Sequence, residues 1–122
     1  MCPFTVNLVY LAELRITTPP RNQTVLNNKR LKLPCKAQGG DLPIRIRWFK
    51  DGELMYKRGQ YYRISDRSGT LRFTRVQVVD RGNYTCKASN DVQQVYSDPA
   101  HLTVHGKRVR VKTNEQEQEE LG

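Results

Sequence analysis

The stretch Asp80-Arg-Gly-Asn-Tyr-Thr-Cys86 decides the fold of this chain, together with Cys35 and Trp48 further upstream. The two cysteines bracket the only tryptophan, and Tyr84 precedes the second cysteine by two residues. Two cysteines on facing sheets, with an indole beside them and a tyrosine at that offset, are parts of one hydrophobic core. The stretch therefore predicts two β layers packed around Trp48.

Short segments in which apolar and polar residues alternate extend outward from this core. Turn-forming pairs such as Asp51-Gly52 and Ser68-Gly69 separate them at intervals of roughly ten residues, which is typical of an all-β sandwich. Pro19-Pro20 suits an edge strand that shifts from one sheet to the other, because proline cannot donate to a ladder. The expected inward residues are Leu31, Leu33, Cys35, Ile44, Ile46, Trp48, Leu71, Phe73, Tyr84, Cys86, Ala88, Leu102 and Val104.

The length and charge of the chain indicate one basic domain. A chain of 122 residues suffices for one two-layer core. We expect an uncharged extension at 1–12, a domain at 13–106 and a charged, flexible tail at 107–122. The formal net charge is +9, and the surplus lies in residues 13–106 because the tail carries equal numbers of basic and acidic residues. Such a body favours anionic partners or serves solubility alone.

The three cysteines point to one disulfide and one remaining thiol. Cys35 and Cys86 lie too far apart for a zinc knuckle and lack flanking ligand pairs, so a structural disulfide and an oxidising compartment are favoured. Cys2 is expected to be a free thiol or an intermolecular link. No segment reaches the roughly 20 apolar residues of a transmembrane helix.

These residues resemble an immunoglobulin-like domain, most closely the intermediate (I-set) type, over about residues 13–106. The resemblance implies a two-sheet antiparallel β-sandwich with one inter-sheet disulfide, Cys35 to Cys86. It rests on Leu33-Pro-Cys35, Trp48-Phe-Lys-Asp-Gly52, Gly69-Thr-Leu71 with Phe73 and Val76, and the pattern from Asp80 through Gly82, Tyr84, Cys86 and Ala88 to Asn90.

The resemblance also implies roles for individual residues. Trp48 is expected to cover the disulfide, and Leu71 to pack in the same core. The Tyr84 hydroxyl is expected to turn back to an upstream carbonyl, the tyrosine corner. Arg63 and Asp80 look like the family's pair that ties the strand carrying Arg63 to the corner before Tyr84, although a surface pair of little energetic value is the alternative.

Two Asn-x-Thr sequons occur, at Asn22 and Asn83. Taken with the cysteine pair, they favour a secreted glycoprotein. Glycosylation of Asn83 is harder to accommodate, because its neighbour Tyr84 must be buried.

The chain offers no catalytic constellation, so we expect no enzyme activity and no cofactor. His101 and His105 are four residues apart, which on a strand separates them by about 13 Å, too far for one metal ion. The glycines lack the lysine and the helix start of a phosphate-binding loop.

Two outer surfaces are candidates for binding. Arg30, Lys32 and Arg72 are expected on one face, where a polyanion such as heparan sulfate would relieve their repulsion. Basic residues without exposed aromatic neighbours offer no stacking platform, so nucleic acid is not expected. The other face is expected to present Arg45, Arg47, Phe49 and Lys87, a combination suited to protein recognition.

The sequence therefore predicts a non-catalytic extracellular module for cell adhesion or receptor recognition, with a protein partner and possibly a sulfated glycosaminoglycan. Two alternatives stay open: a domain that binds polyanions first, and a cytoplasmic I-set scaffold domain of a cytoskeletal protein. The fold does not identify the partner or the oligomeric state.

Overall fold

The structure is a computed structural model that describes residues 13–106. The predictions for 1–12, including Cys2, and for 107–122 lie outside the described residues. Within residues 13–106, no helix has the length and apolar character needed to cross a membrane.

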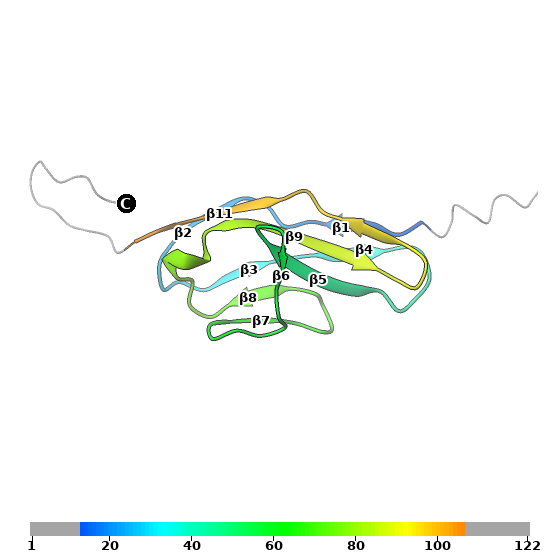
Figure 1. The fold of residues 1–122 in the computed structure, drawn as a ribbon, viewed down its shortest axis with the longest axis horizontal. Coiled ribbons are helices and arrows are strands. Elements are labelled where there is room, and N and C mark those ends of the chain that lie inside the picture. Colours follow the sequence, from blue (N-terminus) through cyan, green and yellow to red (C-terminus); the bar gives the residue numbers. More distant parts are fainter. Residues whose placement is uncertain (1–12, 107–122) are drawn as a thin grey trace, which may run out of the picture.

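The described chain is built from short strands and one turn of 3₁₀ helix (Figure 1). In chain order the elements are β1 (Arg15–Thr18), β2 (Gln23–Leu26), β3 (Leu31–Leu33), β4 (Lys36–Gln38), β5 (Arg45–Lys50), β6 (Glu53–Leu54), β7 (Tyr62–Ile64), β8 (Leu71–Phe73), η1 (Val78–Asp80), β9 (Gly82–Ser89), β10 (Gln94–Tyr96) and β11 (Ala100–His105).

The strands form the two layers of an immunoglobulin-like sandwich, which confirms the predicted fold class. One layer has the strand order β2-β11-β9-β5-β6, with β10 also paired to β9. The other layer contains β3-β8-β7 and, beside it, the pair β1-β4. β3 and β4 are successive parts of one run that is interrupted at Pro34 and Cys35, since proline cannot donate to a ladder.

The first strands change layers at the two prolines, as the sequence indicates. β1 pairs with β4, whereas β2, after Pro19-Pro20, pairs with β11 in the opposite layer. The β2–β11 pairing is parallel, so the sheet is not antiparallel throughout. The other strand pairings are antiparallel.

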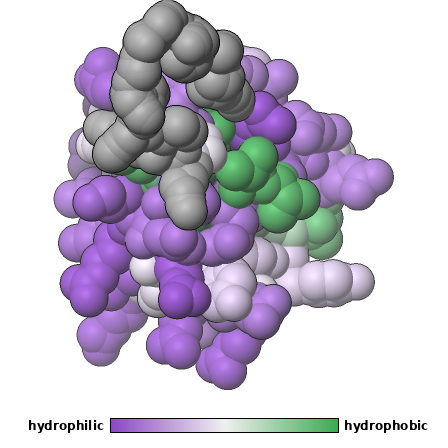
Figure 2. Space-filling view, turned by 90° about the vertical axis from the view of Figure 1, so that its left-hand side faces the viewer, coloured by the Kyte–Doolittle hydropathy of each residue, from purple (hydrophilic) through white to green (hydrophobic). Residues whose placement is uncertain are grey.

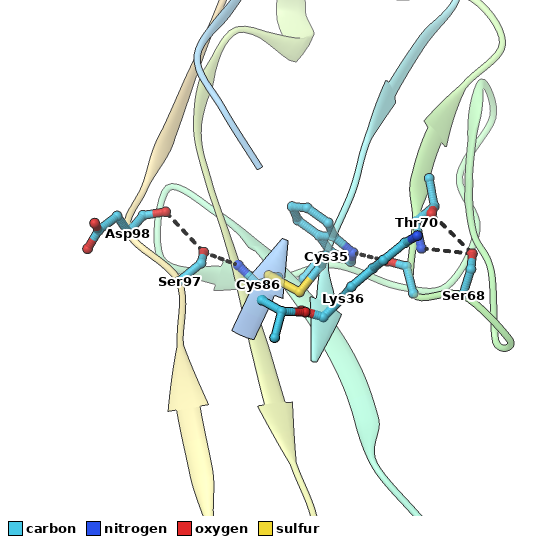
Figure 3. Close-up of a disulfide and its surroundings, with 10 residues drawn as sticks. Cys35, Lys36, Ser68, Thr70, Cys86, Ser97 and Asp98 are labelled. Carbon is cyan, nitrogen blue, oxygen red and sulfur yellow. Dashed lines mark hydrogen bonds between the residues drawn. A yellow bond between two sulfur atoms is a disulfide. The ribbon is translucent and has the colours of Figure 1, made fainter. Parts of the chain in front are cut away.

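The predicted disulfide joins the layers at the centre of the core (Figure 3). The Cα atoms of Cys35 and Cys86 are 6.4 Å apart, and both residues are fully buried. Their separation of 51 residues gives a stabilisation of about 4 kcal/mol on the chain-entropy argument. Trp48 is also fully buried, and its Nε1–H donates to the carbonyl of Gly69 at 2.8 Å.

The carbonyl that accepts the hydrogen bond from the indole belongs to a glycine whose backbone conformation favours that residue type. Gly69 has φ +76°, and a Cβ added there would lie 2.8 Å from Cγ1 of Ile46. A larger residue would therefore be strained and would push the turn away from Trp48.

Tyr84 forms the expected corner on the other side of the core. Its hydroxyl donates to the carbonyl of Asp80 at 2.5 Å, and its ring meets Phe73 edge to face with centroids 5.9 Å apart. Leu71 packs in the same core and is fully buried. Burial raises the pKa of Tyr84 well above its usual value, with a further contribution from the charge of Asp80.

We predict that Tyr84→Phe destabilises the fold by about 1–3 kcal/mol at neutral pH, because the Asp80 carbonyl loses its partner. It should also flatten the alkaline pH dependence. Since the folded-state pKa of Tyr84 is raised, the stability it contributes is present below about pH 10 and is lost as the pH rises above that value. Urea unfolding at neutral pH and above pH 10 measures both effects.

The matched control is Tyr56→Phe, because Tyr56 is 82% exposed. This variant should retain wild-type stability and the wild-type pH dependence. An equal loss of stability in the two variants would contradict the role of the Tyr84 hydroxyl.

Candidate recognition surfaces

The six-stranded sheet brings the predicted protein-binding residues onto one outer face. In its ladder Arg47 lies opposite Lys87, and Lys87 lies opposite Tyr96 on β10. Directly opposed residues of an antiparallel pair project from the same side of the sheet. Trp48 points into the core, so Arg47 and its second neighbour Phe49 point outward.

An aromatic pair lies at the centre of this face. The rings of Phe49 and Tyr96 are tilted, with centroids 6.0 Å apart, and Nζ of Lys87 lies 5.7 Å from the Tyr96 centroid. Tyr96 is 53% exposed, and Leu54, which pairs with Phe49, is 57% exposed. We call this surface the recognition face; its members are Arg45, Arg47, Phe49, Leu54, Lys87 and Tyr96.

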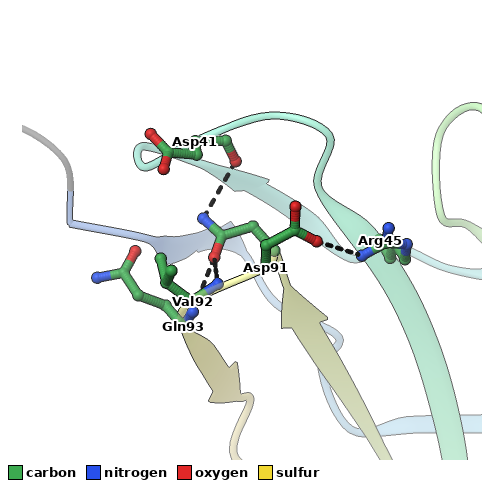
Figure 4. A network of polar contacts seen from close by, with 6 residues as sticks. Asp41, Arg45, Asp91, Val92 and Gln93 are labelled. Atoms are coloured by element: carbon green, nitrogen blue, oxygen red, sulfur yellow. Dashed lines mark hydrogen bonds and ion pairs between the residues drawn. The ribbon is translucent and has the colours of Figure 1, made fainter.

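Arg45 is tied to the turn at one end of the recognition face (Figure 4). Its Nη1 lies 3.6 Å from Oδ1 of Asp91, an exposed pair of little energetic value by itself. The turn is organised by Asn90, which is only 8% exposed. Its Oδ1 accepts the N–H groups of Val92 and Gln93, and its Nδ2 donates to the carbonyl of Asp41.

The opposite layer carries cations in a single row. Lys32 lies opposite Arg72, Arg72 opposite Arg63, and Arg63 opposite Arg58 in an isolated bridge. All four residues are exposed, since the residues flanking Lys32, Arg63 and Arg72 on their strands face inward. We call these four residues the basic row. Arg30, the third residue predicted for polyanion binding, lines a depression beside Lys32 and Arg72.

The basic row is electrostatically unfavourable in the free protein. Neighbouring strands are separated by about 4.8 Å, and two unit charges at roughly 4 Å repel by about 1 kcal/mol in water, which is an upper bound here because the long exposed side chains can spread apart. Within the described residues, ion pairs are formed by Arg45 and Lys57, and none by the basic row. Among residues 13–106, therefore, no carboxylate lies within 4.0 Å of a cation of the row.

The expected pair between Arg63 and Asp80 is not formed. Arg63 projects outward because it lies between Tyr62 and Ile64, which face the core. The Oδ2 atom of Asp80 instead accepts the backbone N–H of Gln77 at 2.7 Å, next to η1. Asp80 thus orders the corner before Tyr84 without Arg63.

Both sequon asparagines lie beside β11 and are exposed. Oδ1 of Asn22 accepts the backbone N–H of His101 at 2.8 Å, and Oδ1 of Asn83 lies 2.9 Å from Nδ1 of the same histidine. Asn83 points outward and Tyr84 inward, because they are adjacent on β9. Both Nδ2 atoms are therefore on the surface, where a glycan could be attached. Glycosylation of Asn22 and Asn83 stays a prediction.

The described part of the chain has no cluster of side chains that could bind a metal ion. Figure 2, a view onto the left-hand end of the molecule as drawn in Figure 1, shows a mostly hydrophilic face with one small group of hydrophobic side chains. Among residues 13–106, no three histidine, cysteine or acidic residues lie close enough together to hold a metal ion. His101 and His105 are both exposed on β11.

The chain belongs to the immunoglobulin domain family. The family's model, described as "Immunoglobulin domain", matches residues 15–90. That range contains the buried disulfide, Trp48 and the tyrosine corner.

The relatives include an inactive tyrosine-protein kinase and a cell adhesion molecule. The chain is 36% identical over 96 residues to inactive tyrosine-protein kinase 7 of Mus musculus, covering 77% of this chain and 8% of that protein. It is 33% identical over 88 residues to the human cell adhesion molecule DSCAML1, covering 71% of this chain and 4% of that protein. The chain thus spans a small fraction of these relatives.

Solved structures agree with the fold. Extracellular domains 3–5 of Drosophila OTK match with a TM-score of 0.63 and 26% identity, over 75% of this chain and 35% of that chain. Titin domain M7 matches with a TM-score of 0.67 and 28% identity, over 76% of this chain and 94% of that chain.

We predict that Asn90→Ala lowers stability by about 1–3 kcal/mol, because it removes the side-chain partners of three backbone groups. Thermal or urea unfolding measures this loss. The control is Asp91→Asn, which removes the negative charge that pairs with Arg45 but keeps the turn. It should lower stability by less than about 0.5 kcal/mol. Equal costs would contradict the role assigned to Asn90.

We predict that Arg72→Gln stabilises the domain by about 0.5–1 kcal/mol at low ionic strength, because it removes the charge between Lys32 and Arg63. The gain should shrink as salt is added, since salt screens the same repulsion. Unfolding midpoints across a salt series measure it. Arg21→Gln is the control outside the basic row; an equal or larger gain there would contradict the assignment.

Proposed function

We propose that this chain is a non-catalytic extracellular recognition module that binds a protein partner through the recognition face, in cell adhesion or receptor–ligand binding. The observation that supports this most is the partly exposed cluster of Phe49 and Tyr96 beside Arg47 and Lys87. Tyrosine and arginine are enriched among residues that dominate binding energy. An aromatic side chain also loses little conformational entropy when it becomes buried.

The geometry of the sheet supports a preformed surface. Arg47, Lys87 and Tyr96 come from three paired strands, so the backbone beneath them is held by the ladder. A rigid platform reduces the ordering cost of association. The side chains also combine apolar area with charge, which suits a partner surface that has acidic residues around an apolar centre.

An extracellular location is supported by three observations. The Cys35–Cys86 disulfide is buried in the core, and structural disulfides persist in oxidising compartments. Relatives of this chain include a cell adhesion molecule. The asparagines of both sequons are exposed, as glycosylation requires.

A cytoplasmic scaffold domain is the second candidate, and the solved structures that this chain resembles include titin domain M7. The redox state of Cys35 and Cys86 separates the two. Alkylation of free thiols in intact cells, followed by mass spectrometry without reduction, should find this pair linked. Alkylated Cys35 and Cys86 would favour the scaffold.

We predict that a Tyr96→Ala, Arg47→Ala double variant loses cell-surface binding. Truncating one residue that dominates binding energy costs about 2 kcal/mol or more, so the loss of even one of the two contacts should lower affinity at least about thirtyfold. A fluorescent tetramer of the domain, applied to a panel of intact cell lines and measured by flow cytometry, provides the readout. Binding by the wild-type tetramer should be sensitive to trypsin treatment of the cells.

The matched control is the double variant Val79→Ala, Arg81→Ala, which removes one exposed apolar and one basic side chain at and just after η1; neither residue is a member of the recognition face. It should bind like the wild type. Equal losses in both double variants, or no trypsin-sensitive binding by the wild type, would refute the proposal. Unfolding curves of each variant verify that the fold is retained.

A further inference from the structure

The basic row has a geometry that a list of charged residues does not reveal. Lys32, Arg72, Arg63 and Arg58 occupy one register position on successive segments of the layer that contains β3, β8 and β7. At about 4.8 Å per step, the four positions span roughly 14 Å perpendicular to the strands. The four residues thus occupy successive positions across the layer.

Two shallow depressions accompany this line and meet at Arg72 and Thr74. One, of about 440 Å³, is lined by Arg58, Arg63 and the hydroxyl residues Ser65 and Thr70, among others. The second, of about 730 Å³, is lined by Arg30 and Lys32 as well as by residues of β8. Among the residues that the structure describes, no carboxylate lines either depression. The surface therefore combines cations with neutral hydrogen-bonding groups.

We propose that this face binds a linear sulfated polysaccharide that lies across the strands along the basic row. Guanidinium groups present paired donors that match the oxygens of a sulfate, and arginine provides three of the four cations. An evenly charged chain would contact successive cations, and the hydroxyl groups beside them can bond to sugar hydroxyls. Binding would remove the repulsion within the row.

The surroundings favour a glycan over other polyanions. Tyr61 lines one of the depressions and is half-buried. Arg75 lies 5.4 Å from the centroid of its ring. One face of the Tyr61 ring is therefore covered, which leaves less aromatic surface within the depressions for stacking nucleic-acid bases. The apolar lining residues Leu31 and Phe73 pack with the core, so they are not available to enter a membrane.

This site is separate from the recognition face. Arg72 and Lys32 belong to one layer, whereas Arg47 and Lys87 belong to the other. The proposal therefore goes beyond protein recognition: one domain could hold a glycan and a protein partner at the same time.

The test measures binding to an immobilised, size-defined heparin oligosaccharide across a salt series. We expect the double variant Arg63→Gln, Arg72→Gln to bind about tenfold more weakly at physiological ionic strength. The slope of log affinity against log salt should fall by roughly one unit per contact removed. The control Arg21→Gln, Arg81→Gln removes the same charge outside the row and should change affinity less than about twofold.

Two further measurements keep the result interpretable. Tryptophan fluorescence and unfolding midpoints verify the fold, and Lys32→Gln, at the end of the row, provides an independent variant expected to weaken binding severalfold. Arg63→Lys with Arg72→Lys keeps the charge but loses the paired donors, so it should bind with intermediate affinity.

Several outcomes would overturn the proposal. Equal losses of affinity in the row variant and the control variant would show that binding depends on net charge alone. Failure of the wild type to bind at physiological ionic strength would show that this face is not a glycan-binding site. Equal or tighter binding to single-stranded DNA, or to vesicles containing phosphatidylserine, would assign the row to phosphate-bearing ligands instead. These results are independent of the recognition face, whose variants retain the basic row.

Discussion

The Cys35–Cys86 bond, packed against Trp48, is the constraint on which the rest of the structure depends. It fixes the interrupted run between β3 and β4 to β9 in the facing layer. The indole fills the space beside it and is oriented by its bond to Gly69. Once these side chains are inside, the two-residue period of each strand determines which neighbours are outside. The positions of the surface charges therefore follow from the core.

Both candidate surfaces illustrate this dependence. On β5, burying Trp48 sends Arg47 and Phe49 outward, where β9 and β10 add Lys87 and Tyr96. On β8, burying Leu71 and Phe73 sends Arg72 outward, where β3 and β7 add further cations. A shift of one residue in either ladder would bury those charges, so the same core that stabilises the fold also enforces the pattern of its surfaces.

The sequence predicted the two layers, the disulfide and the outward direction of most charges, because these depend on spacing and alternation alone. It did not predict strand register, which turn geometry sets. Arg58 and Arg63 were therefore missed as members of the row. Tyr96 was missed because β10 is only three residues long. Pairing Arg63 with Asp80 was wrong: the local alternation at Tyr62 and Ile64 determines where Arg63 points, and a family resemblance does not.

The separation of the two surfaces has an energetic consequence. Facing sheets pack about 10 Å apart, and charges separated by more than about 8 Å are largely screened at physiological ionic strength. A polyanion on the basic row would therefore change the field at the recognition face little. The two binding events should then be nearly independent, and any cooperation between them would arise from a glycan concentrating the domain near its partner, as in multivalent binding.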